Sequence, residues 1–320
     1  MFRSLLKAKI QKAVSGGGFR LYSSAELVQP SCTTEFYPVT SKAKVIKHIH
    51  FPHQLPYQLG NKIQEFIVSK NLEYKKHQIL SRNPKYVQPT TAPQPIPSSV
   101  LTFEFNPVYT GGKREKIHTT FEKQQAIQSL KHVPYVQTSR GGQVTFHGPG
   151  QAVIYPILDL SAYHKLTSKC YVSTIEKSVV GLLRSDSLGL DALTTENTGV
   201  WVKDPTTSII RKVSSIGVNV RRSITSHGVS INCGVNLDYV NDPNVVMCGL
   251  DDFKQTSVEA ELKRLATRAD FSSVDVAFVA KMFVDHLASR LSVTNIESHV
   301  ADFTQDQELE IFKWLDEVVF

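Results

Sequence analysis

Three β-rich stretches in the second half of the chain follow one another without a helical pattern between them: 199–202 (GVWV), 212–220 (KVSSIGVNV) and 228–235 (GVSINCGV). An earlier pair, 133–138 (VPYVQT) and 152–158 (AVIYPIL), is separated only by a glycine-rich stretch. Strands that adjoin without regular helical crossovers favour the α+β class. We therefore expect a mixed, largely antiparallel sheet flanked by helices.

Apolar residues at helical spacing predict helices in three other regions. Pro/Thr/Ser-rich residues 84–99 are incompatible with a helix or a central strand and predict an inserted surface loop. Seven acids against the single base Lys313 in residues 297–317 predict a solvated acidic extension. We expect a linker at 23–42, a catalytic domain at 43–293 and the extension at 294–320. The helical patterns comprise Leu59, Ile63, Phe66 and Ile67 behind Pro56; Val172, Ile175, Val179 and Leu182; and Phe278, Met282, Phe283 and Leu287.

The positive charge of the chain is concentrated at its N-terminus. The formal net charge is +7, but five of the 36 basic residues lie in the first 22 residues, which contain no acid, so the remainder carries only +2. A nucleic-acid partner is therefore not expected. Cations interleaved with apolar residues, without a continuous apolar run, are typical of a mitochondrial matrix presequence at 1–22. We expect cleavage after Tyr22; a disordered basic tail on a cytosolic protein is the alternative.

Cysteine spacing and hydropathy exclude several classes of protein. No run of eighteen apolar residues is present, so no membrane span is expected. The four cysteines form no CxxC pair, and neither structural disulfides nor a zinc or other metal site is expected. Cys170 and Cys233 are interpreted as packed thiols.

Residues 139–151, SRGGQVTFHGPGQ, form what we call the glycine loop. Glycine lets the backbone approach a ligand closely. The P-loop spacing and the dinucleotide fingerprint are both absent, because a strand and not a helix follows Gln151. The residues alone leave two interpretations open: a ligand-binding loop, or a tight β connection with a solvated Arg140 and a structural His147.

Four separated motifs resemble the lipoyl(octanoyl) transferases: RGGQVTFHGPGQ, KVSSIG beginning at Lys212, HGVSIN at 227–232 and MCG around Cys248. LTFEFNPVYTGG and GVWV also resemble strands of that family, so the similarity covers roughly residues 45–290. Together with the N-terminal segment, the pattern is similar to mitochondrial, fungal-type members. The sequence departs from the bacterial pattern at Met247, where a proline is usual.

This resemblance implies a fold shared with biotin and lipoate protein ligases, and an activity without a cofactor. Octanoyl groups would pass from acyl carrier protein to a lysine of lipoyl-domain proteins, such as the glycine cleavage H protein and 2-oxo acid dehydrogenase E2 subunits, in the mitochondrial matrix. It implies Cys248 as the nucleophile and Lys212 as its activating partner. The substrate pocket would comprise Arg140, Gly141, Gly142, Gln143, Val144, Thr145, Phe146, His147, Ser215, Ile216, Gly217, Gly228, Val229 and Ser230.

Two alternatives of a different kind remain at this point. An ATP-dependent lipoate protein ligase of the same fold also uses a lysine and a glycine loop, but needs no cysteine. A binding module for lipoyl domains or acyl carriers would bind without turnover.

Overall fold

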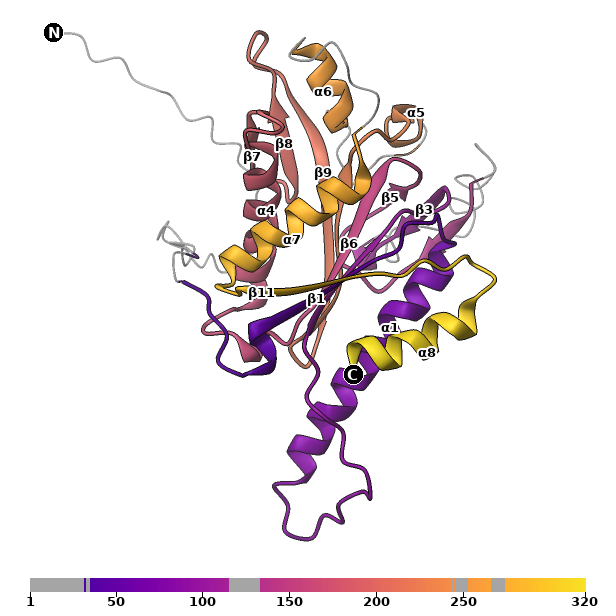
Figure 1. Cartoon of the computed structure of the whole chain (residues 1–320). Helices are drawn as coiled ribbons and strands as arrows, with labels where there is room; N and C mark the ends of the chain where they lie inside the picture. Colours follow the sequence, from indigo (N-terminus) through magenta and orange to yellow (C-terminus); the bar gives the residue numbers. More distant parts are fainter. Residues whose placement is uncertain (1–31, 33–34, 115–132, 243–244, 246–252, 266–273) are drawn as a thin grey trace, which may run out of the picture. The chain divides into compact units, whose positions relative to one another are not determined.

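The structure, a computed structural model, describes residue 32 and residues 35–114, 133–242, 245, 253–265 and 274–320. The expected presequence at 1–22, its cleavage position and much of the 23–42 linker lie outside these residues. Residues 34–320 form one compact unit. Its elements (Figure 1) are η1 Lys42–Lys44, β1 Val45–His50, α1 Tyr57–Leu80, β2 Ser98–Phe103, β3 Val108–Gly111, β4 Tyr135–Gln137, β5 Thr145–His147, β6 Gln151–Ile157, η2 Leu160–Ala162, α4 Ser168–Leu183, β7 Ala192–Leu193, β8 Val200–Lys203, β9 Ile210–Arg221, β10 Ile224–Asn232, α5 Leu237–Val240, α6 Val258–Arg264, α7 Val276–Arg290, β11 Asn295–Val300 and α8 Glu308–Val319.

The described strands form two sheets. The larger has the order β11-β1-β2-β6-β10-β9-β8-β7, and the smaller has the order β4-β3-β5. Within the larger sheet β1 pairs in parallel with β2 and β11, and the remaining pairs are antiparallel. The prediction of an α+β fold with a mixed, largely antiparallel sheet is confirmed.

The glycine loop connects the two sheets. The strand before it, β4, lies in the small sheet, whereas β6 lies at the centre of the large one. Residues 145–147, which the sequence places within the loop, form the short strand β5 paired with β3. The loop is thus shorter than expected and is held at both ends by strands.

Helices cover both faces of the central strand β6, whose residues are all buried. On one face Val153 and Tyr155 share a hydrophobic cluster with Ile63 and Ile67 of α1. The alternate residue Ile154 is also fully buried, on the face that α4 and α7 cover while packing against each other. Burial on both faces explains why this strand is a continuous apolar run rather than an alternating one. None of the helices in the described ranges has both the length and the apolar character that a membrane span needs.

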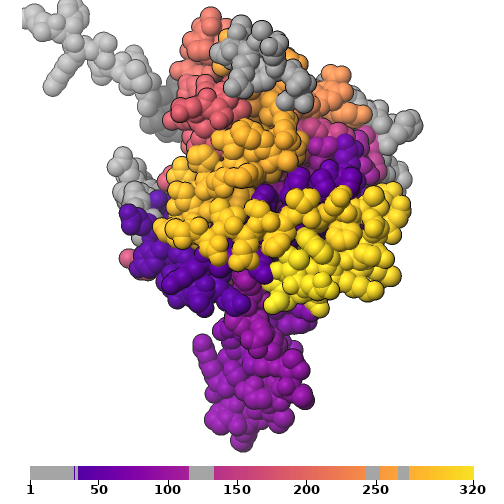
Figure 2. Space-filling view, viewed as in Figure 1, coloured from indigo at the N-terminus to yellow at the C-terminus, as the bar shows by residue number. Residues whose placement is uncertain are grey.

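The C-terminal residues are integrated into the fold rather than forming a solvated tail. Strand β11 pairs with β1, so the yellow C-terminal segment lies directly against the indigo N-terminal region (Figure 2). Helix α8 buries Ile311, Leu315 and Val319 completely, and each such burial contributes about 1.5–3 kcal/mol. Its acids lie on the outer face, where Glu308 pairs with Lys62 of α1 at 2.8 Å. The acidic composition therefore marks the polar face of an amphipathic helix.

Candidate active site

A cavity of about 270 Å³ lies between the glycine loop and strands β9 and β10. Most residues that the sequence placed in the pocket line this cavity, although they come from three separate stretches of the chain. The strand pairing explains the convergence, because Gly228 lies opposite Gly217 and Ser230 opposite Ser215 in the β9–β10 ladder. The predicted residues in its lining are Arg140, Gly142, Gln143, Thr145, His147, Lys212, Ser215, Ile216, Gly217, Gly228, Val229 and Ser230.

Gly141, Val144 and Phe146, which were expected in the pocket, do not line this cavity. Val144 and Phe146 are each 1% exposed and pack in a separate hydrophobic cluster with Tyr109 and Val235. Their alternation with Thr145 and His147 follows from the strand conformation of β5, in which successive side chains point to opposite faces. A family motif read as one continuous run therefore contains both cavity-lining and core positions.

The loop lies directly on strand β9. The N–H of Gly141 donates to the carbonyl of Val218 at 2.9 Å. A Cβ on Gly217 would stand 2.8 Å from the Gly141 carbonyl oxygen, and Gly142 has φ +92°. This approach requires bare backbone on both sides, so these glycines close one side of the cavity.

Arg140 holds the loop to the small sheet. It is only 7% exposed, and its guanidinium donates to the carbonyl and hydroxyl oxygens of Thr110 at 2.6 and 2.9 Å and to its neighbour's carbonyl at 3.0 Å. The alternative of a solvated arginine in a plain β connection does not hold. The charge instead contributes to the wall of the cavity.

Lys212 is buried in the same wall, with 3% of its surface exposed. Its Nζ donates to the carbonyl of Thr198 at 2.9 Å and lies 5.4 Å from the centre of the Trp201 ring. A buried ammonium needs such partners, because an unpaired one carries a large desolvation cost. The side chain is therefore held in the wall of the cavity rather than solvated.

His147 is tied into a buried chain of hydrogen bonds. The amide nitrogen of Gln151 donates to Phe146 and to Oδ1 of Asn232, so Gln151 Oε1 must be the acceptor for Nδ1 of His147 at 2.7 Å. Burial lowers the pKa of His147 to about 4. The ring is therefore neutral near pH 7 with its proton on Nδ1. A group with this pKa is a weak general base at pH 7, which favours a positioning role.

His227, beside the predicted pocket residues on β10, also lines the cavity. Its φ of +56° is unusual for a non-glycine residue, and its backbone N–H donates to Oε1 of Gln64. The ring is 2% exposed and packs edge-on against Tyr155. Burial lowers its pKa to about 3. The cavity thus contains two uncharged imidazoles.

Other lining residues escaped sequence reasoning. Val153 and Tyr155 could have been found from the period-two pattern of β6, once its faces were assigned. The segment 196–198 gave no signal, because only the fold brings the Thr198 carbonyl to Lys212. The additional lining residues are Arg114, Val153, Tyr155, Glu196, Asn197 and Thr198.

The chain returns to Lys212 at residues 254–256. The N–H of Lys212 donates to the carbonyl of Lys254 at 3.0 Å, and the N–H of Thr256 donates to the carbonyl of Lys212 at 2.8 Å. Gln255 is thereby bridged in parallel to Lys212. This contact matters for the predicted nucleophile because Gln255 lies seven residues after Cys248 in the sequence.

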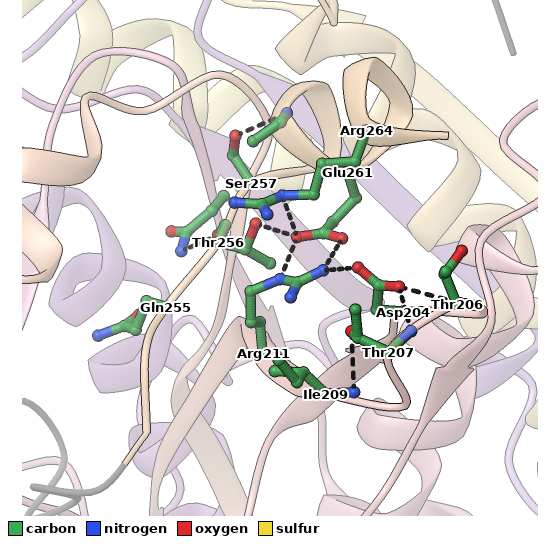
Figure 3. A network of polar contacts seen from close by, with 12 residues as sticks. Asp204, Thr206, Thr207, Ile209, Arg211, Gln255, Thr256, Ser257, Glu261 and Arg264 are labelled. Carbon is green, nitrogen blue, oxygen red and sulfur yellow. Dashed lines mark hydrogen bonds and ion pairs between the residues drawn. The ribbon is translucent and has the colours of Figure 1, made fainter. Parts of the chain in front are cut away.

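A buried ionic network fixes this return segment from the other side of β9 (Figure 3). Arg211 binds both carboxylate oxygens of Glu261, at 2.7 and 2.8 Å, and Asp204 at 3.0 Å. Glu261 also accepts the hydroxyl hydrogen of Thr256 at 2.5 Å. Two-point arginine–carboxylate contacts are geometrically specific. The network therefore fixes the positions of α6 and residue 256 relative to strand β9.

The cysteines differ from the sequence expectation in two respects. Cys32 and Cys170 are each disulfide-bonded, so the expectation that the chain has no structural disulfide and the interpretation of Cys170 as a packed thiol are both wrong. Cys233 is free and buried, and burial raises its pKa to about 12, which makes it unreactive. Cys248, the predicted nucleophile, lies outside the described residues.

The chain matches known proteins both in its family model and in its fold. Residues 84–288 match the family model of the lipoyl protein ligase A/B catalytic domain. The fold is similar to that in the crystal structure of P. falciparum LipL1 in complex with lipoate, with a TM-score of 0.51 and 11% identity over 85% of this chain and 71% of that one. The fold is therefore that of the lipoyl ligase and transferase catalytic domains.

Curated relatives narrow the class. The chain is 38% identical to the mitochondrial octanoyltransferase of Saccharomyces cerevisiae, over 82% of this chain and 86% of the relative. It is 35% identical to the mitochondrial octanoyltransferase of Kluyveromyces lactis, over 87% and 90%. The chain therefore belongs to the mitochondrial octanoyltransferase family of acyltransferases. The resemblance and the mitochondrial location expected from the sequence are confirmed.

Proposed function

We propose that this protein transfers an octanoyl group from the thioester of acyl carrier protein to a lysine ε-amine on lipoyl-domain proteins, through a thioester on Cys248. The glycine cleavage H protein and the E2 subunits of 2-oxo acid dehydrogenases are the acceptors we propose. The observation that carries this proposal is the buried ammonium of Lys212 at the cavity wall, with the chain that follows Cys248 hydrogen-bonded to its backbone.

The charge of Lys212 supplies what a cysteine nucleophile needs. A free thiol has a pKa of about 8.5, and a neighbouring ammonium favours the reactive thiolate. Lowering that pKa by about two units requires roughly 2.7 kcal/mol of differential interaction. A close cation that is largely removed from water can provide this energy.

The reaction proceeds in two steps with one proton moving through Lys212. The Cys248 thiolate attacks the thioester carbonyl, forms a new C–S bond and displaces the carrier thiolate, which takes a proton from the Lys212 ammonium. The neutral acceptor amine then attacks the acyl-enzyme. It forms the amide, gives its proton to the Lys212 amine and releases the Cys248 thiolate, so the starting state is restored.

The cavity suits an uncharged acyl chain. At about 0.8 kcal/mol per buried methylene, the six methylenes of an octanoyl group would contribute roughly 5 kcal/mol to binding. Gly217 and Gly228 contribute no side chain to its lining, and His147 and His227 are uncharged near pH 7. Their rings can hydrogen-bond to polar groups of the carrier arm without placing charge beside the chain.

The test is intact-mass measurement after incubation with octanoyl-acyl carrier protein. We expect wild-type protein to gain one octanoyl group that hydroxylamine removes, and Cys248→Ala to gain none. A Cys248→Ser variant that keeps full activity with lipoate and ATP would instead establish the ligase alternative. Binding of acyl carrier protein without any acylation of wild type would establish the binding-module alternative.

A further inference from the structure

A single peptide group joins Lys212 to Glu176. Its carbonyl, that of Thr198, accepts a hydrogen bond from Lys212 Nζ at 2.9 Å. Its N–H, that of Gly199, donates to Oε1 of Glu176 at 3.0 Å. Glu176 is a half-buried residue of helix α4, and Lys212 lies on strand β9. A hydrogen-bonded path therefore leads from the helix to the ammonium in the cavity wall.

The neighbouring chain holds the two ends of this segment but does not fix the orientation of the peptide between them. On one side, the carbonyl of Asn197 accepts from the indole N–H of Trp201 at 3.3 Å. On the other side, Val200 pairs with Ser214 of β9. Type I and type II turns differ by such a rotation of one peptide plane, of about 180°, with the flanking residues in place. Gly199 permits the rotation because glycine accepts both signs of φ.

The two partners of the peptide select one of these orientations. A carboxylate only accepts hydrogen bonds, and an ammonium only donates them. The N–H must therefore face Glu176 and the carbonyl must face Lys212, because the rotated peptide would set acceptor against acceptor and donor against donor. Burial raises the pKa of the Glu176 carboxyl, whereas the Gly199 N–H and the Lys212 charge favour its ionised form.

From this geometry we infer that Glu176 is a positioning residue for Lys212, which holds the 198–199 peptide with its carbonyl toward the ammonium. This inference rests on the proposed function, in which Lys212 moves the proton. Glu176 is not among the described residues that line the cavity, so it acts on the reaction through Lys212. Without an acceptor at position 176, both peptide orientations become populated, and the ammonium loses its carbonyl partner for part of the time.

Two substitutions of similar size separate the hydrogen bond from the charge. Glu176→Met keeps an unbranched side chain but has no strong acceptor for the Gly199 N–H. Glu176→Gln removes the negative charge and keeps a carbonyl oxygen that can accept from the same N–H. Glu65→Met is the matched control, because Glu65 is also a half-buried helical carboxylate, paired with Arg221 at 2.6 Å and outside the described lining of the cavity.

The experiment measures kcat and the KM for octanoyl-acyl carrier protein in transfer to a lipoyl domain. We expect Glu176→Met to lower kcat by about tenfold or more and to leave KM within about twofold of wild type. The variants Glu176→Gln and Glu65→Met should keep kcat within about threefold of wild type. Single-turnover reactions then repeat the comparison in a Lys212→Met background. There Glu176→Met should change the rate by less than about twofold, because the group that it positions is absent.

Each outcome supports or overturns the inference. If wild type transfers no octanoyl group, the proposed function fails and the inference fails with it. If wild type is active, an unchanged kcat in Glu176→Met overturns the inference alone. An equal loss of rate in the two backgrounds also overturns it, since Glu176 would then act independently of Lys212. A loss in Glu176→Gln as large as that in Glu176→Met would assign the effect to charge instead. Should Glu176→Met not fold, Glu176→Ala decides by the same criteria.

Discussion

Gly199 occupies the position that a side chain would have to share with Lys212: a Cβ built on Gly199 would stand 2.7 Å from Lys212 Cε and 2.5 Å from the Ser214 carbonyl oxygen. The backbone of Gly199 also has φ +127° and donates to Glu176 at 3.0 Å. The missing side chain of Gly199 therefore leaves the space that Lys212 occupies, and the hydrogen bond to Thr198 holds the ammonium there.

Gly199→Ala should therefore displace the ammonium and lower octanoyl transfer at least tenfold, measured as kcat/KM. The control is Gly189→Ala, which shares a positive φ of +59° but has nothing within 4 Å of the added Cβ. Backbone strain costs Gly189→Ala about 1–2 kcal/mol of stability, because φ +59° lies in the left-handed helical region. Gly199→Ala is strained as well, since its φ of +127° is a conformation that side chains rarely adopt, and it adds the overlap with the Ser214 carbonyl oxygen. Equal activity of the two variants would show that crowding at Lys212 is unimportant.

Replacing the cation itself gives a stronger effect. Lys212→Met should raise the apparent pKa of the Cys248 thiol toward about 8.5. It should also lower kcat by about 10²–10⁴, the usual contribution of a positioned proton-transfer group. Iodoacetamide alkylation across pH and single-turnover transfer measure the two effects separately. Unimpaired transfer by Lys212→Met would remove this lysine from the mechanism.

Acid should destabilise the folded protein through its buried histidines. Burial lowers the pKa of His147 from 6.5 to about 4. On acidification the folded state therefore protonates this ring at a lower pH than the unfolded state does. The neutral ring's contribution is fully present above pH 6.5 and is lost as pH falls from there toward 4. By linkage, this difference in pKa between the folded and unfolded states corresponds to about 3 kcal/mol in the free energy of unfolding.

The measurement is urea unfolding of wild type and His147→Gln at pH 7, 5 and 4. We expect the variant to lose less of its free energy of unfolding on acidification than wild type does. His53→Gln, at an exposed ion pair with Asp302, serves as the surface control. An identical pH dependence in wild type and His147→Gln would refute the assignment.

The buried pair of Arg211 and Glu261 should show strong coupling. Removing one partner leaves the other charge buried, so Arg211→Met or Glu261→Leu alone should cost about 3–5 kcal/mol, whereas the double variant should cost less than the sum. Denaturant unfolding of all four proteins gives the coupling energy. Simple additivity would mean that the 2.7 Å contact makes no net contribution.

The C-terminal helix should contribute to stability through one face only. Leu315→Ala removes a fully buried side chain and should cost about 2–5 kcal/mol. Leu309 lies in the same helix at 74% exposure, and Leu309→Ala should change the free energy of unfolding by less than about 0.5 kcal/mol. Similar losses for the two variants would indicate that α8 does not pack as described.

The helical patterns were informative about where helices form but less so about which residues they bury. The pattern at 278–287 predicted α7, yet Phe278 is 42% exposed while Val279 and Val284 are fully buried. Hydrophobic spacing identifies a helix by its period, whereas the buried face depends on which neighbours pack against it. The acids of residues 297–317 led to the wrong prediction of a solvated extension for a similar reason. Composition does not show that the apolar residues between these acids share one face of helix α8.

The sequence by itself determined the sheet class, through strands that adjoin without crossovers, and it determined the family, through four short motifs in the right order. It also indicated Lys212 and the glycine loop as parts of one site. Only the tertiary structure decided that Val144 and Phe146 face away from the cavity and that the Thr198 carbonyl and Gly199 accommodate the lysine. It alone brought Lys212 and Gln255 together. These features depend on contacts between residues that are distant in sequence. A local pattern of side chains does not determine which backbone atoms come into contact when the strands pair.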